Sequence, residues 1–196
     1  MANFQAFIIV LVAAAAAAPA PVQQPPDTDR PVLAEFARRV NAYVEVKSAA
    51  ATTVLPLVQL RDPAEIRRRT DALAAVIKSA RWAAKQGDIF TPEIGYALRR
   101  AIRQGCEGDY AAQLALVREE VVGPLPALAV HARWPADVPL PLMLPGVLAA
   151  LPPLPAGLQY RFMDRALVLL DIDANLIVDF LPDAIPVITT ERHDAH

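Results

Sequence analysis

The sequence has few of the residues that mark disulfide-linked or nucleotide-binding proteins. It contains one cysteine, Cys106, and 7 glycines among 196 residues. A disulfide within the chain is therefore impossible, so a folded domain must rely on its apolar core. No glycine-rich phosphate loop is present. We expect Cys106 to be half-buried at a helix end. A bond from this thiol to a second chain stays open.

Aromatic and serine residues are also scarce. Aromatic residues make up 6% of the chain, whereas prolines number 19. This balance favours helices separated by stiff connections over a β-sandwich. The only serines, Ser48 and Ser79, fall inside predicted helices and outside any Gly-x-Ser-x-Gly motif, which argues against serine catalysis. A Cys106–His131 nucleophilic pair is conceivable but has no local signature.

The first 18 residues contain no charged side chain. An apolar run from Phe7 to Val12 is followed by alanines up to Ala18, the order found in secretory signal peptides. The run of about 15 residues is shorter than the ~20 that a transmembrane helix needs. We therefore expect residues 1–18 to be a signal peptide, with no transmembrane span after processing, and the protein to be periplasmic or secreted. An uncleaved anchor and a structural helix are the alternatives.

The middle of the chain has the periodicity of amphipathic helices. Residues 19–29 are a proline-rich spacer that we expect to be extended. Helices are then predicted by spacing and by Asp-Pro or Thr-Pro starts. They span Asp29 (as the cap) to about Thr53, Asp62 to Gly87, Thr91 to Gly105 and Asp109 to about Val122.

The last third of the chain changes character. Nine prolines from Pro124 to Pro155 forbid a long regular element, so we expect a wrapping segment with a short helix near 142–151. Three short apolar runs separated by turns follow at 158–162, 166–170 and 176–180, which predicts an antiparallel β-meander with a covered central strand. The sequence thus predicts one mostly helical α+β domain over 30–186, with a flexible tail over 187–196.

Two parts of the sequence resemble known families. The run Gln86–Glu93 after an arginine-rich helix, combined with the Leu158–Pro186 meander, resembles an uncharacterised family of exported bacterial proteins. That resemblance implies no known activity. The meander alone, from Tyr160 to Asp179, is similar to periplasmic nickel/cobalt-homeostasis proteins, but the histidine-rich stretches of a metal handler are absent.

Positive charge gathers in the first half of the chain and negative charge in the second. Residues 30–105 hold 14 Lys/Arg against 7 Asp/Glu, whereas residues 106–196 hold 5 against 12. Such halves could attract each other, within the chain or between chains. The basic half includes six arginines on two predicted helices, namely Arg67, Arg68, Arg69, Arg99, Arg100 and Arg103.

These arginines are the candidate binding residues. The simpler interpretation is a solvated helix face paired with nearby carboxylates. The functional one is contact with an acidic partner protein or an anionic component of the bacterial envelope. Export, the acidic second half and the lack of an aromatic stacking platform argue against nucleic acid. The sequence therefore favours an exported, non-enzymatic binding domain.

Carboxylates around the meander offer the rival interpretation. An enzyme site could draw on Asp164, Asp171, Asp173 and Asp179. The Asp171-x-Asp173-x-Asn175 run imitates the start of a calcium loop, but the glycine and glutamate that such a loop requires are replaced by Leu176 and Pro182, so we interpret the run as a turn. His193 and His196 form at most a weak tail site. We predict no cofactor and no metal.

Overall fold

The computed structural model describes residues 29–56, 61–106, 128–135, 140 and 143–185. The elements are α1 (Arg30–Ala51), α2 (Pro63–Ala80), α3 (Pro92–Gly105), α5 (Pro145–Ala150), β1 (Leu158–Met163), β2 (Ala166–Asp171) and β3 (Leu176–Leu181). The predicted α+β class is confirmed. The predicted signal peptide, spacer, tail and 109–122 helix lie outside the described residues.

The three strands form one antiparallel sheet in the order β1-β2-β3. All six residues of β2 are buried, which confirms that the middle strand is central and covered on both faces. Because side chains alternate across a strand, Leu167 and Leu169 face the helices while Val168 and Leu170 face the other way. The pairing of β2 with β3 shifts register between Leu169 and Leu170.

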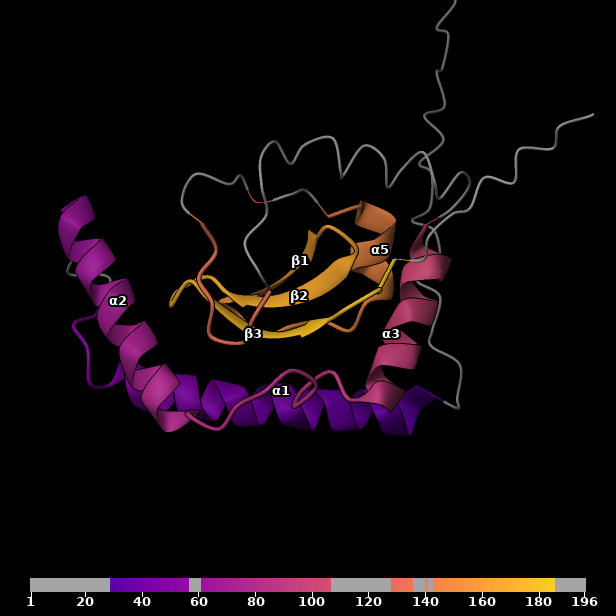
Figure 1. The fold of residues 1–196 in the computed structure, drawn as a ribbon, viewed down its shortest axis with the longest axis horizontal. Coiled ribbons are helices and arrows are strands. Elements are labelled where there is room, and N and C mark those ends of the chain that lie inside the picture. Colours follow the sequence, from indigo (N-terminus) through magenta and orange to yellow (C-terminus); the bar gives the residue numbers. More distant parts are fainter. Residues whose placement is uncertain (1–28, 57–60, 107–127, 136–139, 141–142, 186–196) are drawn as a thin grey trace, which may run out of the picture.

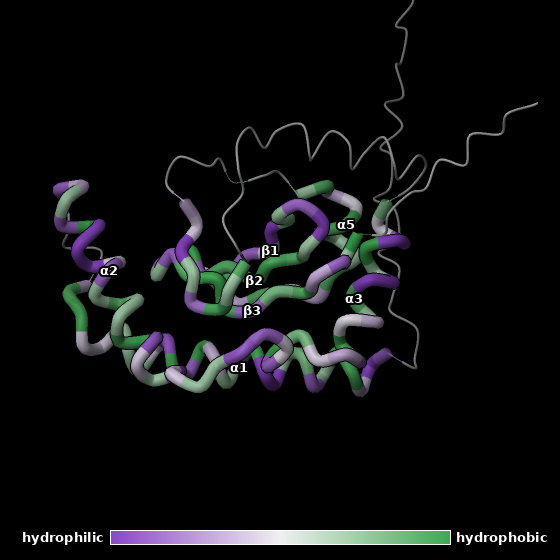
Figure 2. The backbone as a smooth tube through the Cα atoms, in the orientation of Figure 1, coloured by the Kyte–Doolittle hydropathy of each residue, from purple (hydrophilic) through white to green (hydrophobic). Residues whose placement is uncertain are grey.

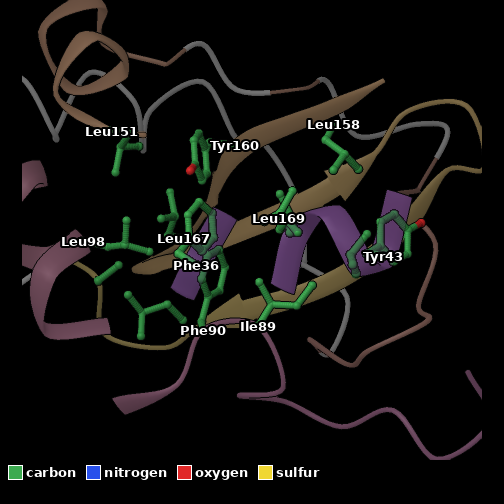
Figure 3. Packing of buried hydrophobic residues seen from close by; sticks show 14 of the residues in the cluster. Phe36, Tyr43, Ile89, Phe90, Leu98, Leu151, Leu158, Tyr160, Leu167 and Leu169 are labelled. Carbon is green, nitrogen blue, oxygen red and sulfur yellow. The ribbon is translucent and has the colours of Figure 1, made fainter. Parts of the chain in front are cut away.

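Helix α1 lies along one face of the sheet, with α2 at one end of α1 and α3 at the other (Figure 1). Its buried residues Phe36, Val40 and Tyr43 recur at helical spacing, as the sequence predicts. Phe36 stacks on Phe90 with ring centroids 5.9 Å apart (Figure 3). Figure 2 shows hydrophobic residues along the strands and an alternation of hydrophobic and hydrophilic stretches along α1.

The opposite face of the sheet is covered by part of the proline-rich connection. Trp134 is buried and packs with Val168, Leu170 and Ile177. The His131 amide donates to the Ile177 carbonyl at 2.8 Å, and the Ile177 amide donates to the Ala132 carbonyl at 2.9 Å. The described part of this connection therefore covers the sheet, as predicted.

Two helix starts are capped as the sequence predicts, and one is not. The Asp62 carboxylate accepts a bond from the Ala64 amide at 2.8 Å, and the Thr91 hydroxyl accepts one from the Ile94 amide at 3.4 Å. Asp29 occupies the cap position of α1, but its side chain makes no cap bond. The predicted cap position is thus confirmed, but the side chain does not cap the helix because its carboxylate instead binds Arg100 at 2.5 Å.

The predicted end of the second helix is also wrong, because α2 stops at Ala80 rather than at Gly87. The following residues are held by tertiary contacts that a continued helix could not make. The Arg81 guanidinium lies 5.0 Å from the centre of the Tyr43 ring, and the sheet binds the backbone of residues 87–90. Gly87 does mark a turn, since its φ is +89°.

Helices α3 and α5 approach each other through glycines. A Cβ added to Gly105 would lie 2.5 Å from the Gly146 carbonyl oxygen and 2.6 Å from Val147 Cα. The two backbones are therefore in direct contact at this point, which fixes the C-terminal end of α3 against the segment that leads into the sheet.

Candidate functional site

The structure does not bring the six predicted arginines onto one face. Arg67, Arg68 and Arg69 lie on α2, whereas Arg99, Arg100 and Arg103 lie on α3 (Figure 1). Since these helices stand at opposite ends of α1, the chain presents two separate basic groups. Each group has to be judged by its own surroundings.

The α2 group belongs to the part of the helix that makes least contact with the core. The buried residues of α2 are Leu73, Ala74 and Ile77, all in its second half. Arg67 and Arg68 are exposed, and Arg68 is 3.9 Å from Glu65. Arg69 donates to the Leu55 carbonyl at 2.9 Å. This group therefore has the character of a solvated helix face.

The α3 group surrounds an exposed tyrosine. The Tyr96 side chain is 71% exposed, and Arg99, Arg100 and Arg103 follow it by three, four and seven residues. Such spacing places all four side chains on the same outer side of a helix. The inner side carries Ile94, Ala97, Leu98 and Ile102, which are buried. We call Tyr96, Arg99, Arg100 and Arg103 the α3 face.

The arginines of the α3 face differ in their partners. Arg99 donates to the carbonyls of Asp183 and Pro182, at 3.0 and 2.8 Å, so its side chain is anchored, and it forms no ion pair within the described ranges. Arg100 is paired with the buried Asp29. Arg103 is exposed and makes no ion pair with the described residues. The face thus combines fixed and free cations with an aromatic ring.

The start of α3 is held firmly. Its cap residue Thr91 is followed by Pro92 and by Glu93 in the first turn. Hydrogen bonds from the Glu93 backbone and from Thr91 lower the pKa of the Glu93 carboxyl, and this negative charge is favourable at a helix N-terminus.

Asp171, at the end of β2, is completely buried and fully bonded. Its Oδ2 accepts from the Tyr43 hydroxyl at 2.6 Å, and its Oδ1 accepts from Lys47 Nζ at 2.9 Å. The same Oδ1 also accepts from the backbone amides of Asp173 and Ala174, at 2.9 and 3.1 Å. Burial, followed by the charge of Asp171, raises the pKa of Tyr43. These contacts join α1 to the β2–β3 turn and confirm that the Asp171 run is a turn.

Asp179, in β3, is the second buried carboxylate. Its Oδ2 accepts from the amides of Ile89 and Phe90, at 2.7 and 2.8 Å. Its Oδ1 accepts from the amides of Gly87 and Phe180, at 2.9 and 2.8 Å. Four backbone donors therefore saturate one carboxylate, which holds the segment between α2 and α3 against the sheet.

The other two candidate carboxylates lie in turns. Asp164 is exposed in the β1–β2 turn with φ +51°, and Asp173 forms a 2.7 Å ion pair with Lys47. Asp171 and Asp173 share one cation, Lys47, which forms an ion pair with each of them. The four carboxylates are therefore not gathered at one place, whereas the enzyme interpretation requires a cleft that holds two of them.

Cys106 lies at the C-terminal end of α3, which confirms its predicted place at a helix end, but it is 6% exposed and so buried rather than half-buried. Burial raises the pKa of its thiol. Within the described ranges, no three His, Cys, Asp or Glu side chains are grouped so that they could hold a metal ion. His193 and His196 lie outside those ranges. Among the helices that the structure describes, none has the length and apolarity to cross a membrane.

Two of the residues that define these sites were not singled out from the sequence. Tyr96 lies on the side of α3 opposite its apolar positions, so helical periodicity alone could have predicted its exposure. Lys47 forms ion pairs with two aspartates that are more than 120 residues away in sequence. No local pattern could have found that contact.

No protein-family model, curated protein or solved structure matches this chain. The resemblances to exported bacterial proteins and to nickel/cobalt-homeostasis proteins therefore stay predictions, and function has to be argued from the side chains.

Proposed function

We propose that this chain is an exported, non-enzymatic binding domain whose α3 face contacts an acidic partner protein or an anionic component of the bacterial envelope. The observation that carries the proposal is the 71% exposure of Tyr96 among three arginines on a helix that begins with the cap residue Thr91. Tyrosine and arginine are the residues most enriched where binding energy concentrates. An exposed ring beside cations gives a partner both apolar area and charge.

The α3 face is a better candidate than the α2 group because it is already ordered. Arg99 is anchored on two carbonyls and Arg100 on Asp29, so less side-chain freedom is lost on binding. Helix α2 contains no aromatic residue, and its basic half makes few core contacts. A rigid surface with an aromatic centre favours specific binding over a merely solvated face.

The enzyme alternative draws less support. Asp171 and Asp179 are both completely buried, and each accepts four hydrogen bonds from its own chain. A catalytic carboxylate needs a site within reach of a reacting atom. These two carboxylates serve instead to hold helical and loop segments on the sheet.

The binding proposal can be tested with the chain purified from the periplasmic fraction. Two probes represent the two partner classes: vesicles containing an anionic phospholipid, and poly-glutamate. We expect Tyr96→Ala and Arg103→Glu each to weaken binding of at least one probe by tenfold or more. Arg67→Glu, which makes the same charge change on α2, is the matched control and should have little effect. Equal losses in the α2 and α3 variants, or binding to neither probe, would contradict the assignment to α3.

Export is tested separately. If residues 1–18 are a signal peptide, N-terminal sequencing of the protein from the periplasmic or secreted fraction should give a start between Ala17 and Pro21. An intact Met1 or Ala2 on soluble cytoplasmic protein would contradict export while leaving the α3 face to be judged by its own experiment.

A further inference from the structure

A hollow lies along β1, which is an edge strand of the sheet. The segment before β1 folds back along it, since the Leu158 amide donates to the Pro155 carbonyl at 3.2 Å and the Tyr160 hydroxyl donates to the Pro152 carbonyl at 3.1 Å. The space left between this segment, α5 and the strand has a volume of about 420 Å³. That volume falls within the range of small-molecule sites, roughly 300–1,000 Å³.

The lining of this β1 hollow is amphipathic. Leu148, Pro152, Pro153 and Leu154 contribute apolar surface, and Gln159 and Arg161 contribute polar groups. Leu148 stands at the rim, where it is 52% exposed. Apolar walls with a few converging polar groups are typical of sites for small organic ligands.

Arg161 lines this hollow and forms no ion pair with any carboxylate that the structure describes. Its Nη1 donates to the Tyr160 carbonyl at 2.7 Å, and its Nη2 donates to the Gln159 amide oxygen. Its Nε is shielded from solvent and makes no hydrogen bond. Burial lowers the pKa of Arg161, and no carboxylate among the described residues offsets this effect.

Four other partly exposed arginines form ion pairs, whereas Arg81 and Arg99 bind backbone carbonyls and, for Arg81, the Tyr43 ring. Arg39 pairs with Glu35, Arg100 with Asp29, Arg133 with Asp71 and Arg165 with Asp183. A half-buried cation without such a partner is costly, because the neutral oxygens it reaches do not compensate its charge. Arg161 is therefore suited to an anion that is supplied from outside the chain.

We propose that the β1 hollow binds a small amphipathic carboxylate, whose anionic group pairs with Arg161 and whose apolar body lies against Leu148 and the Pro152–Leu154 segment. A carboxylate would take the place that the Gln159 amide oxygen now occupies on Nη2, and it would add the charge that this neutral oxygen lacks. The acid could be a free aliphatic acid or the C-terminus of an apolar peptide. This site is independent of the α3 face.

Calorimetric titration of the exported chain with octanoate and with acetylated trileucine tests the proposal. Octanol and the trileucine amide are the matched uncharged probes. We expect at least one acid to bind with a dissociation constant of 1 mM or tighter, on the order expected for a small ligand. Its uncharged counterpart should bind at least tenfold more weakly. Binding of octanoate alone would identify a free acid as the source, and binding of trileucine alone a peptide terminus.

Variants separate the site from general stability. Arg161→Met keeps much of the side-chain volume but removes the charge, and it should weaken the acid at least tenfold. Arg165→Met, in which an arginine paired with Asp183 is lost instead, should leave binding unchanged. Leu148→Glu at the exposed rim cannot disturb the core and should also weaken the acid. The proposal is overturned if neither acid binds at 1 mM, or if the acid binds Arg161→Met and Leu148→Glu as well as the parent.

Discussion

Replacing Asp179 with asparagine perturbs the contact on which the connection between α2 and α3 depends. The two oxygens of Asp179 accept four backbone amides, two each. Asparagine has nearly the same shape, but only one of its two terminal atoms is an acceptor. The other becomes an NH2 group that faces two amide donors. One of the two pairs of hydrogen bonds is therefore lost whichever way the amide is oriented.

The magnitude follows from those two lost bonds. Hydrogen bonds to a charged group contribute about 1.5–3 kcal/mol each, so two represent roughly 3–6 kcal/mol. The loss is partly offset because asparagine no longer requires burial of a charge. We expect the free energy of unfolding to fall by about 2–4 kcal/mol, a large share of the ~5–15 kcal/mol that a domain of this size typically has.

Urea unfolding followed by circular dichroism measures this change. Asp183→Asn is the matched control, because Asp183 is 66% exposed and forms only a surface pair with Arg165. Surface pairs contribute up to about 1 kcal/mol, and asparagine tolerates the φ of +50° found at Asp183. If Asp179→Asn unfolds within about 0.5 kcal/mol of the parent protein, the carboxylate does not hold the 87–90 segment as we argue.

Three further predictions concern other parts of the fold. Gly105→Ala should destabilise the protein by about 1–3 kcal/mol in urea, despite the better helix propensity of alanine, because the new Cβ meets the Gly146 carbonyl at 2.5 Å. Burial, followed by the charges of Arg81 and Lys78, lowers the pKa of His131, so the stability of the fold should fall as the pH drops below about 6.5. Melting temperatures measured across this pH range should fall less for His131→Asn than for the parent protein. Val168→Asp buries a charge at a side chain that is 0% exposed, at a cost of several kcal/mol, and should leave no cooperative unfolding transition.

The sequence predicted those parts of the fold that depend on local signals. A proline directly after Asp62 and after Thr91 marks the starts of α2 and α3. The strands are short apolar runs bounded by turn residues. The end of α2 could not be predicted in this way. Ala83 and Ala84 favour a longer helix locally, but the chain turns at Arg81, whose guanidinium lies over the Tyr43 ring, and Asp179 binds the backbone further along.

The sequence predicted which residue types make up the candidate site, but not how the fold groups them. The arginines are evident from the sequence, yet their division between two ends of α1 depends on how α2 and α3 pack. The pairing of Arg100 with Asp29 spans 71 residues and has no local signature. Arg161 could not be singled out from the sequence either, because its significance depends on having no nearby carboxylate among the described residues. Such an absence is visible only in three dimensions.

The buried carboxylate of Asp179 is connected to the α3 face through the residues that precede α3. Asp179 binds the amides of Ile89 and Phe90, and the next residue, Thr91, caps α3. The position of Tyr96 is thus set from the sheet through a short chain of hydrogen bonds. A binding surface loses less entropy when its backbone is fixed in advance. Weakening the Asp179 contact should therefore reduce the proposed binding at the α3 face even in protein that remains folded.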